Sequence, residues 1–228
     1  MSSYFNLTLD TSAPELPIIL IEAGAGYTAT QLVNCAISTS DGATIGYQMK
    51  IWGNVDTSND SNVQATEGAS SWTTFAATKQ VKLSSGDGSK TLYLKIRDSV
   101  YNESSQASDS ISLDTTVPVT TISMGPDVTV VSKVIGKRTC SFSFQCDSIF
   151  DEYKIKVVPA TDSINSAGTQ IETTNGSTNM SGNAGDYPAL TNINCIIDGA
   201  DLEIASSGDG TKIIKVFTKD KLGLWSIV

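Results

Sequence analysis

The sequence contains no histidine. Histidine is the commonest general base in enzymes, so its absence excludes Ser-His-Asp and Cys-His nucleophile systems. Long apolar runs are also missing, because the longest, residues 16–21, is the length of a buried strand and not of the roughly 18–20 residues that cross a bilayer. Residues 1–4 show neither a basic nor an apolar signal region, so we expect synthesis in a cytoplasm without a signal peptide and no membrane partner.

Basic residues are scarce, with 15 Lys and Arg against 24 Asp and Glu and a net charge of −9. An acidic surface repels phosphate backbones, so we expect no nucleic-acid partner. Carboxylates are plentiful, but no spacing singles out the pair that a glycosidase needs. We therefore predict no catalytic residues, no enzymatic activity and no cofactor.

Cysteines are few, and none of the four forms a C-x-x-C pair. Cys140 and Cys146 alternate with Phe142 and Phe144, which places all four on one face of a strand. Buried free thiols are one interpretation. A disulfide from Cys140 or Cys146 to Cys195 is the alternative, although cytoplasmic synthesis keeps thiols reduced.

The most informative stretch that the sequence does contain occurs twice. Residues 84–90 and 206–212, which lie 122 residues apart, both have the pattern Ser-Ser-Gly-Asp-Gly-(Ser/Thr)-Lys. Each copy leads into an apolar–polar segment that ends at Asp98 or Asp220. The glycines predict positive-φ turns, and the alternation predicts strands. A repeated turn and strand indicate two copies of one β-domain.

Other matches keep nearly the same spacing. Leu-Asp-Thr-x-x-Pro occurs at 9–14 and 113–118, and alternating segments near Cys35 and Tyr47 match those near Cys140 and Tyr153. No helical period is convincing. We therefore predict an all-β fold of two tandem immunoglobulin-like (Ig-like) β-sandwich domains. Domain 1 spans residues 1–112 with an N-terminal strand at 4–9, and domain 2 spans 113–228 with a longer polar loop at 160–188.

The repeated motifs carry a family resemblance. The Gly-Asp-Gly-(Ser/Thr)-Lys turn, the strand ending in Asp, the following Asn-Glu-Ser (102–104) or Leu-Trp-Ser (224–226), and the Leu-Asp-Thr-Thr-x-Pro hinge together resemble bacterial and phage Ig-like repeats. The resemblance covers nearly the whole chain. A short, acidic, two-domain form without a signal looks like a decoration protein of a tailed-phage virion.

This resemblance implies a multi-copy structural module on the virion exterior, bound to major capsid or tail proteins. The alternative is a carbohydrate- or receptor-binding adhesin module whose partner is a host surface glycan. Trp52, Trp72 and Trp225 are spread along the chain, and we expect core or inter-domain packing for each, with a sugar-binding face as the alternative.

One acidic stretch has the spacing of a calcium loop. Asp56, Ser58, Asp60 and Asn62 alternate, and Glu67 follows Asp56 by eleven residues. Ser61 stands where an EF-hand needs glycine, and no helices are predicted on either side. We therefore predict no metal site and keep Asp56, Asp60 and Glu67 as the candidate ligands.

Two segments are candidates for partner contact, and they are listed as Tyr4, Phe5, Leu7 and Leu9 in the first and Asn175, Asn179 and Met180 in the second. Domain 1 continues fifteen residues beyond Asp98, whereas only eight follow Asp220. Domain 2 thus has room for at most a short strand at 224–228, and an unpaired sheet edge there would accept another chain. Residues 4–9 either add to such an edge on a neighbouring protein or form the first strand of domain 1.

Overall fold

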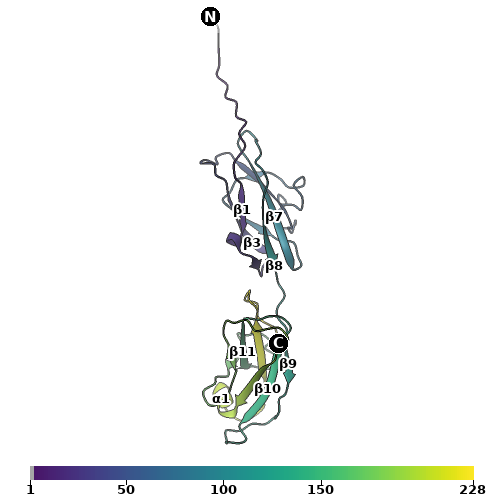
Figure 1. Cartoon of the computed structure of the whole chain (residues 1–228), viewed down its shortest axis with the longest axis vertical. Coiled ribbons are helices and arrows are strands. Elements are labelled where there is room, and N and C mark those ends of the chain that lie inside the picture. Colours follow the sequence, from purple (N-terminus) through teal and green to yellow (C-terminus); the bar gives the residue numbers. More distant parts are fainter. Residues whose placement is uncertain (1–2) are drawn as a thin grey trace. The chain divides into compact units, whose positions relative to one another are not determined.

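The computed structural model describes residues 3–228, and the chain divides into two compact units, Met1–Thr115 and Thr116–Val228 (Figure 1). The boundary predicted after residue 112 falls inside β8 (Ala107–Leu113), because Leu113 still pairs with Gly88 in unit 1. Strands make up nearly all of the regular structure, which confirms the all-β prediction. A short helix, α1 (Gly199–Ala205), was not predicted.

Unit 1 is a sandwich of two sheets. One sheet has the order β1-β3-β6, with bounds Ile18–Ile21, Leu32–Ser38 and Thr78–Lys82. The other has the order β2-β8-β7-β4-β5, in which β2 is Tyr27–Thr28, β7 is Gly88–Arg97, β4 is Gln48–Gly53 and β5 is Thr73–Thr74. Alternate side chains of both sheets meet in the core, as the strand periodicity predicts, for example Ile21, Cys35, Leu92, Leu94 and Ile96. A single 3-10 turn, η1 (Glu22–Gly24), follows β1 within the described chain.

Unit 2 repeats this plan. Its first sheet has the order β14-β10-β9, with bounds Ile193–Asp198, Thr139–Cys146 and Thr120–Met124. In its second sheet β11 (Glu152–Val157) pairs with β15 (Ile214–Lys219) on one side and with the short strands β12 (Thr169–Gln170) and β13 (Ser181–Gly182) on the other. An aromatic cluster fills the core, with ring centroids 4.9–6.4 Å apart, formed by Phe144, Phe150, Tyr153 and Tyr187.

The repeated turns have the predicted backbone. Gly86 and Gly208 both have φ of 80°, and Gly88 and Gly210 also lie at positive φ. The repeated lysine closes each turn, because Lys90 Nζ donates to the Ser85 carbonyl at 3.1 Å and Lys212 Nζ donates to the Ser207 carbonyl at 3.1 Å. In the second copy the strand begins only at Ile214, so residues 211–213 connect turn and strand.

The end of each repeated strand is held by the same set of hydrogen bonds. Asp98 Oδ1 accepts the N–H groups of Val100 and Asn102, and Asp220 Oδ1 accepts those of Leu222 and Leu224. Burial opposes ionisation of Asp98, but its hydrogen bonds outweigh that effect and hold its pKa below the ordinary value. Both aspartates therefore form Asx turns, in which a side-chain oxygen accepts backbone N–H groups two and four residues ahead.

The two aspartates differ in their second oxygen. Asp98 Oδ2 accepts from Asn102 Nδ2 at 2.8 Å. The residue at the matching position in unit 2 is Leu224, which has no donor in its side chain. Asp220 Oδ2 is accordingly one of two buried side-chain polar atoms without a hydrogen-bond partner in the described part of the chain.

A buried serine completes each strand end. The Ile96 N–H donates to Ser104 Oγ at 3.0 Å and the Ser104 N–H donates back to the Ile96 carbonyl at 2.8 Å. Thr218 and Ser226, 122 residues later, make the same two bonds at the same lengths. The shared Ser of the Asn-Glu-Ser and Leu-Trp-Ser motifs is therefore a structural residue.

Ser226→Ala is expected to destabilise unit 2, and Ser104→Ala unit 1, each by about 1–3 kcal/mol, because a buried strand N–H loses its acceptor. Calorimetry that resolves the transitions of the two units measures both effects. Ser105→Ala, at an exposed neighbour, is the control and should leave the thermogram unchanged. If the melting temperature of unit 1 were the same in Ser104→Ala and Ser105→Ala, the structural role of Ser104 would be contradicted.

Residues 3–17 form no strand, so the prediction of a strand at 4–9 within unit 1 is wrong. A strand needs a hydrogen-bonding neighbour, and the described chain places none beside this segment. The first strand of the unit is β1, which begins after Pro17. Domain 2 was expected to have room for at most a short strand at 224–228, and none forms there, since Trp225 makes only an isolated bridge to Lys219.

Candidate interaction site

The candidate metal ligands are not brought together. Asp56 pairs with Lys82 at 2.8 Å, Asp60 with Lys79 at 2.5 Å, and Glu67 with Lys95 at 2.7 Å. The hydrogen bonds from Lys82 and Ser58 lower the pKa of Asp56 to about 2. Residues 3–228 hold no group of three or more Cys, Asp or Glu side chains placed to bind a metal ion. Each carboxylate instead forms an ion pair with a different lysine, of which Lys95 also lies 3.6 Å from Glu103.

All four cysteines are free, so the alternative of a disulfide to Cys195 is not realised. Burial raises the pKa of Cys195 to about 12. Burial, with a smaller contribution from the charges of Glu22 and Asp109, likewise raises the pKa of Cys35 to about 12. A thiol with so high a pKa supplies almost no thiolate, which makes these two cysteines packing residues rather than nucleophiles.

The three tryptophans lie in two environments. Trp52 is buried and stacks on Tyr93 with ring centroids 5.7 Å apart, but it lies on the face of β4 opposite the core residues Met49 and Ile51. Trp72 and Trp225 are only partly buried and lie against cations, which corrects the expectation of core packing for them. The Arg97 guanidinium is 4.4 Å from the Trp72 ring centroid, and Lys154 Nζ is 4.6 Å from that of Trp225.

The loop candidates are tied to the body of unit 2. Met180 is wrong as a contact residue, because its side chain is buried in the core beside the aromatic cluster. Asn179 Nδ2 donates to the Asn194 carbonyl at 2.7 Å. Asn175 donates its N–H and its Nδ2 to Asp201 Oδ1 at 2.8 and 2.9 Å. The asparagines are exposed, but their amides hold the loop in place.

Asp201 explains why this loop is ordered. It lies on α1 and also accepts the Ser177 N–H at 3.0 Å. Burial opposes its ionisation, but the bonds from Ser177 and Asn175 prevail and hold its pKa below the ordinary value. The predicted polar loop at 160–188 therefore follows the sandwich closely and contributes β12 and β13 to it.

The N-terminal candidates, unlike the loop candidates, are not packed against the body of their unit. Tyr4, Phe5, Leu7 and Leu9 are 84–88% exposed. Single exposed apolar side chains are common, but four large ones within six residues make this segment a candidate for contact with a partner.

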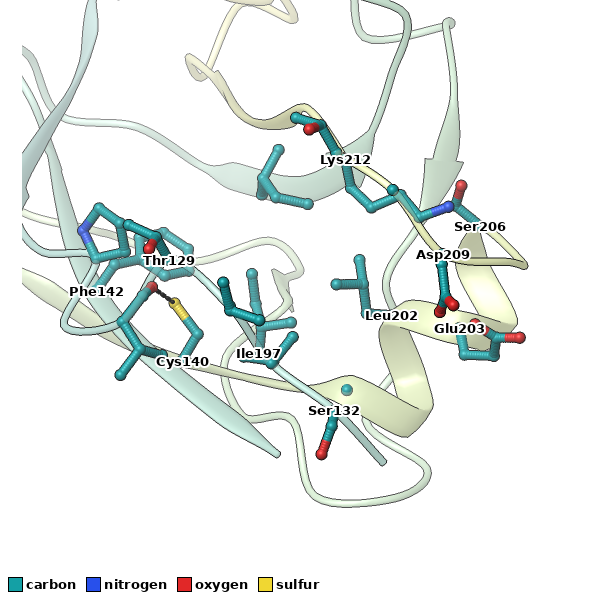
Figure 2. A pocket seen from close by; sticks show the side chains of 18 of the residues that line it. Thr129, Ser132, Cys140, Phe142, Ile197, Leu202, Glu203, Ser206, Asp209 and Lys212 are labelled. Carbon is teal, nitrogen blue, oxygen red and sulfur yellow. Dashed lines mark hydrogen bonds between the residues drawn. The ribbon is translucent and has the colours of Figure 1, made fainter. Parts of the chain in front are cut away.

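A cavity of about 920 Å³ opens on unit 2 (Figure 2). Its walls are mainly apolar and include Ile122, Phe142, Ile197, Leu202, Ile214 and Val216. Figure 2 shows Phe142 and Ile197 on one side, Leu202 rising from α1, and Asp209 and Lys212 of the Gly-rich turn at the rim. Sequence reasoning missed this cavity.

The cavity lies beside β15, where residues 116–228 supply no counterpart of β8. In unit 1, β8 pairs with β7 and contacts β1. In unit 2, β15 corresponds to β7, and within the described residues its pairing is with β11 alone, apart from the bridge at Trp225. The predicted unpaired edge is therefore present, and it belongs to β15.

The first strands of the two units differ in how far their apolar side chains are exposed. Ile122 of β9 lines the cavity and is 49% exposed, whereas Ile19 and Ile21 of β1, which face the core of unit 1, are 2% and 0% exposed. Both strands are apolar, but only β1 has a strand such as β8 packed against it. The open edge and the cavity thus form one surface, which we call the β15 groove.

Comparison with known proteins adds little to this description. No family model matches the chain, and no curated protein matches it. Among solved structures, fibronectin(III)-like modules of Clostridium thermocellum CbhA align with 92% of this chain and 89% of theirs, at 10% identity and a TM-score of 0.41. Chitinase ChiA74 from Bacillus thuringiensis aligns with 92% of this chain at 12% identity and a TM-score of 0.31.

Neither likeness is close enough to bear on function, and the chain spans only 30% of the chitinase. The Ig-like sandwich is established by the chain's own sheets and their order. No helix in the described residues is both long and apolar enough to span a membrane.

Proposed function

We propose that this chain is a non-enzymatic structural protein of a tailed-phage virion, an Ig-like decoration module on the capsid or tail exterior. The β15 groove is the observation that carries the proposal. It combines an unpaired strand edge with an apolar cavity, and such edges bind other polypeptides by strand addition.

The non-enzymatic part of the proposal rests on the chemistry of the side chains. The sequence has no histidine, the best-spaced carboxylates are paired with lysines, and the Cys35 and Cys195 thiols are buried with raised pKa values. The apolar β15 groove offers packing surface and backbone edges, which suit a protein partner better than a reacting substrate.

The virion part rests on the motif resemblance described above. It implies several copies per particle, major capsid or tail proteins as partners, and no nucleic acid, in keeping with the net charge of −9. A glycan-binding adhesin module remains the alternative, with the partly buried Trp72 and Trp225 as its nearest candidates, but cations already lie against both rings.

The test is to express the chain with an affinity tag during infection by the phage whose genome encodes it, and to purify particles on a density gradient. We expect the tagged chain to band with the particles in a fixed ratio to the major capsid or tail protein. Absence from the particles, together with retention on cell-wall glycan, would replace this proposal with the adhesin function.

A further inference from the structure

The strand that closes unit 1 has a second copy in the sequence. Residues 111–115 of β8 and its continuation are Ile-Ser-Leu-Asp-Thr, and residues 7–11 are Leu-Thr-Leu-Asp-Thr, 104 residues earlier. In β8 the side chains of Ile111 and Leu113 are buried in the sandwich. Leu7 and Leu9 are their counterparts, and Phe5 follows on the same face because side chains alternate along a strand.

The strand that would receive this copy also has a precedent in unit 1. In β7, Gly88, Lys90 and Leu92 lie opposite Leu113, Ile111 and Asp109 of β8. The residues 122 positions later are Gly210, Lys212 and Ile214, and all three line the β15 groove. A strand added there in the register of β8 would place Leu9, Leu7 and Phe5 opposite these residues, facing the cavity.

A polar contact at the strand end fits the same register. In unit 1, Thr115 donates its N–H and its hydroxyl to Asp87 Oδ1, both at 2.8 Å. The counterpart of Thr115 is Thr11, and the counterpart of Asp87 is Asp209 at the rim of the groove. Phe5 differs in chemistry from its counterpart in β8, Asp109. Asp109 bonds to the Ile21 N–H in unit 1, whereas Phe5 takes its place and suits the apolar cavity.

We propose that residues 4–9 of a second copy of this chain bind the β15 groove as the missing strand, antiparallel to β15. Phe5, Leu7 and Leu9 fill the cavity, and Tyr4, Asn6 and Thr8 face outward as Ser108, Ser110 and Ser112 do in β8. The inference rests on the proposed structural function, because it names the partner of the same open edge. Burial of three exposed apolar side chains and pairing of an open strand edge drive the association.

The first test compares matched variants of the full chain by analytical ultracentrifugation over a range of concentrations. The natural chain is expected to form concentration-dependent oligomers. Phe5→Asp with Leu9→Asp should weaken association by at least about tenfold, because the carboxylates would lie opposite Ile214 and beside Asp209, where no cation faces them. Asn6→Asp with Thr8→Asp adds the same charge to the opposite face and should keep the association.

The second test fills the groove within one chain. β8 begins 122 residues before the position directly after Val228, so residues 3–11 appended there can reach the groove of their own unit. This variant is expected to be monomeric, to melt at a higher temperature in unit 2, and to protect the amides of Ile214 and Val216 from hydrogen exchange. A free peptide of residues 3–11 should protect the same amides in the Phe5→Asp, Leu9→Asp variant.

A natural chain that stays monomeric at all concentrations would overturn the proposal, and so would a self-filled variant without added protection at Ile214 and Val216. Equal loss of association in the two double variants would also overturn it, since charge rather than the buried face would then be responsible. These outcomes are separate from the virion test. Oligomers that are absent from particles refute only the virion role, and a monomer found on particles refutes only strand exchange.

Discussion

Gly53→Ala is expected to destabilise unit 1 by about 3–5 kcal/mol, because it combines backbone strain with a collision. Gly53 has φ of +135° at the end of β4, and an added Cβ would lie 2.2 Å from the Thr91 carbonyl oxygen of the neighbouring strand β7. Relief of that contact would require β4 and β7 to separate in the middle of their sheet.

The matched control is Gly88→Ala, which tests backbone strain without collision. Gly88 has φ of +116°, but an added Cβ would meet nothing within 4 Å. We expect Gly88→Ala to lower the free energy of unfolding of unit 1 by about 1–3 kcal/mol. Calorimetry that resolves the transition of unit 1 measures both variants. If both variants lost the same free energy of unfolding, the collision with the Thr91 carbonyl would not explain the need for glycine at position 53.

Phe144→Ala is expected to destabilise unit 2 by about 3–5 kcal/mol. Phe144 is fully buried, with its ring centroid 5.1 Å from that of Tyr153 and 6.4 Å from that of Phe150. Removing the ring leaves a cavity that the fixed aromatic neighbours cannot fill. Phe144→Leu retains part of the side-chain volume, so it should lower the free energy of unfolding of unit 2 by less than half as much.

Calorimetry distinguishes this effect from a general loss of stability. The two units have separate cores, so the transition of unit 1 should keep its melting temperature in both Phe144 variants. A parallel shift of both transitions would contradict independent cores.

The parts of the fold that were predicted correctly are those with local signals. Alternation over residues 88–97 gives β7 its inward Leu92, Leu94 and Ile96, and the glycines of each repeated turn require positive φ. The helix α1 was missed because seven residues span too few turns to show a helical period. Its capping signal was available, since Asp198 accepts the Ala200 N–H at 2.8 Å.

The errors at the candidate site concern non-local packing. Met180 lies in a polar, Gly-rich stretch, and only the pairing of β13 with β11 turns its side chain into the core. The segment 4–9 alternates like a strand but has no neighbouring strand within its own unit. The open edge of the β15 groove was predicted, but its cavity was not, because residues that are far apart in the sequence, from β9, β10, β14, α1 and β15, line it together.

In the proposed strand exchange, each chain offers a strand, residues 4–9, and a different surface, the β15 groove, so copies associate head to tail. Binding of residues 4–9 to the groove of another copy is a heterologous contact, in which two different surfaces meet. Each added copy covers one groove and brings one new uncovered groove, so growth does not exhaust its own binding sites. A filament results unless the rotation between copies closes a ring, and its length is set by concentration or by a capping partner that offers a groove or a strand but not both.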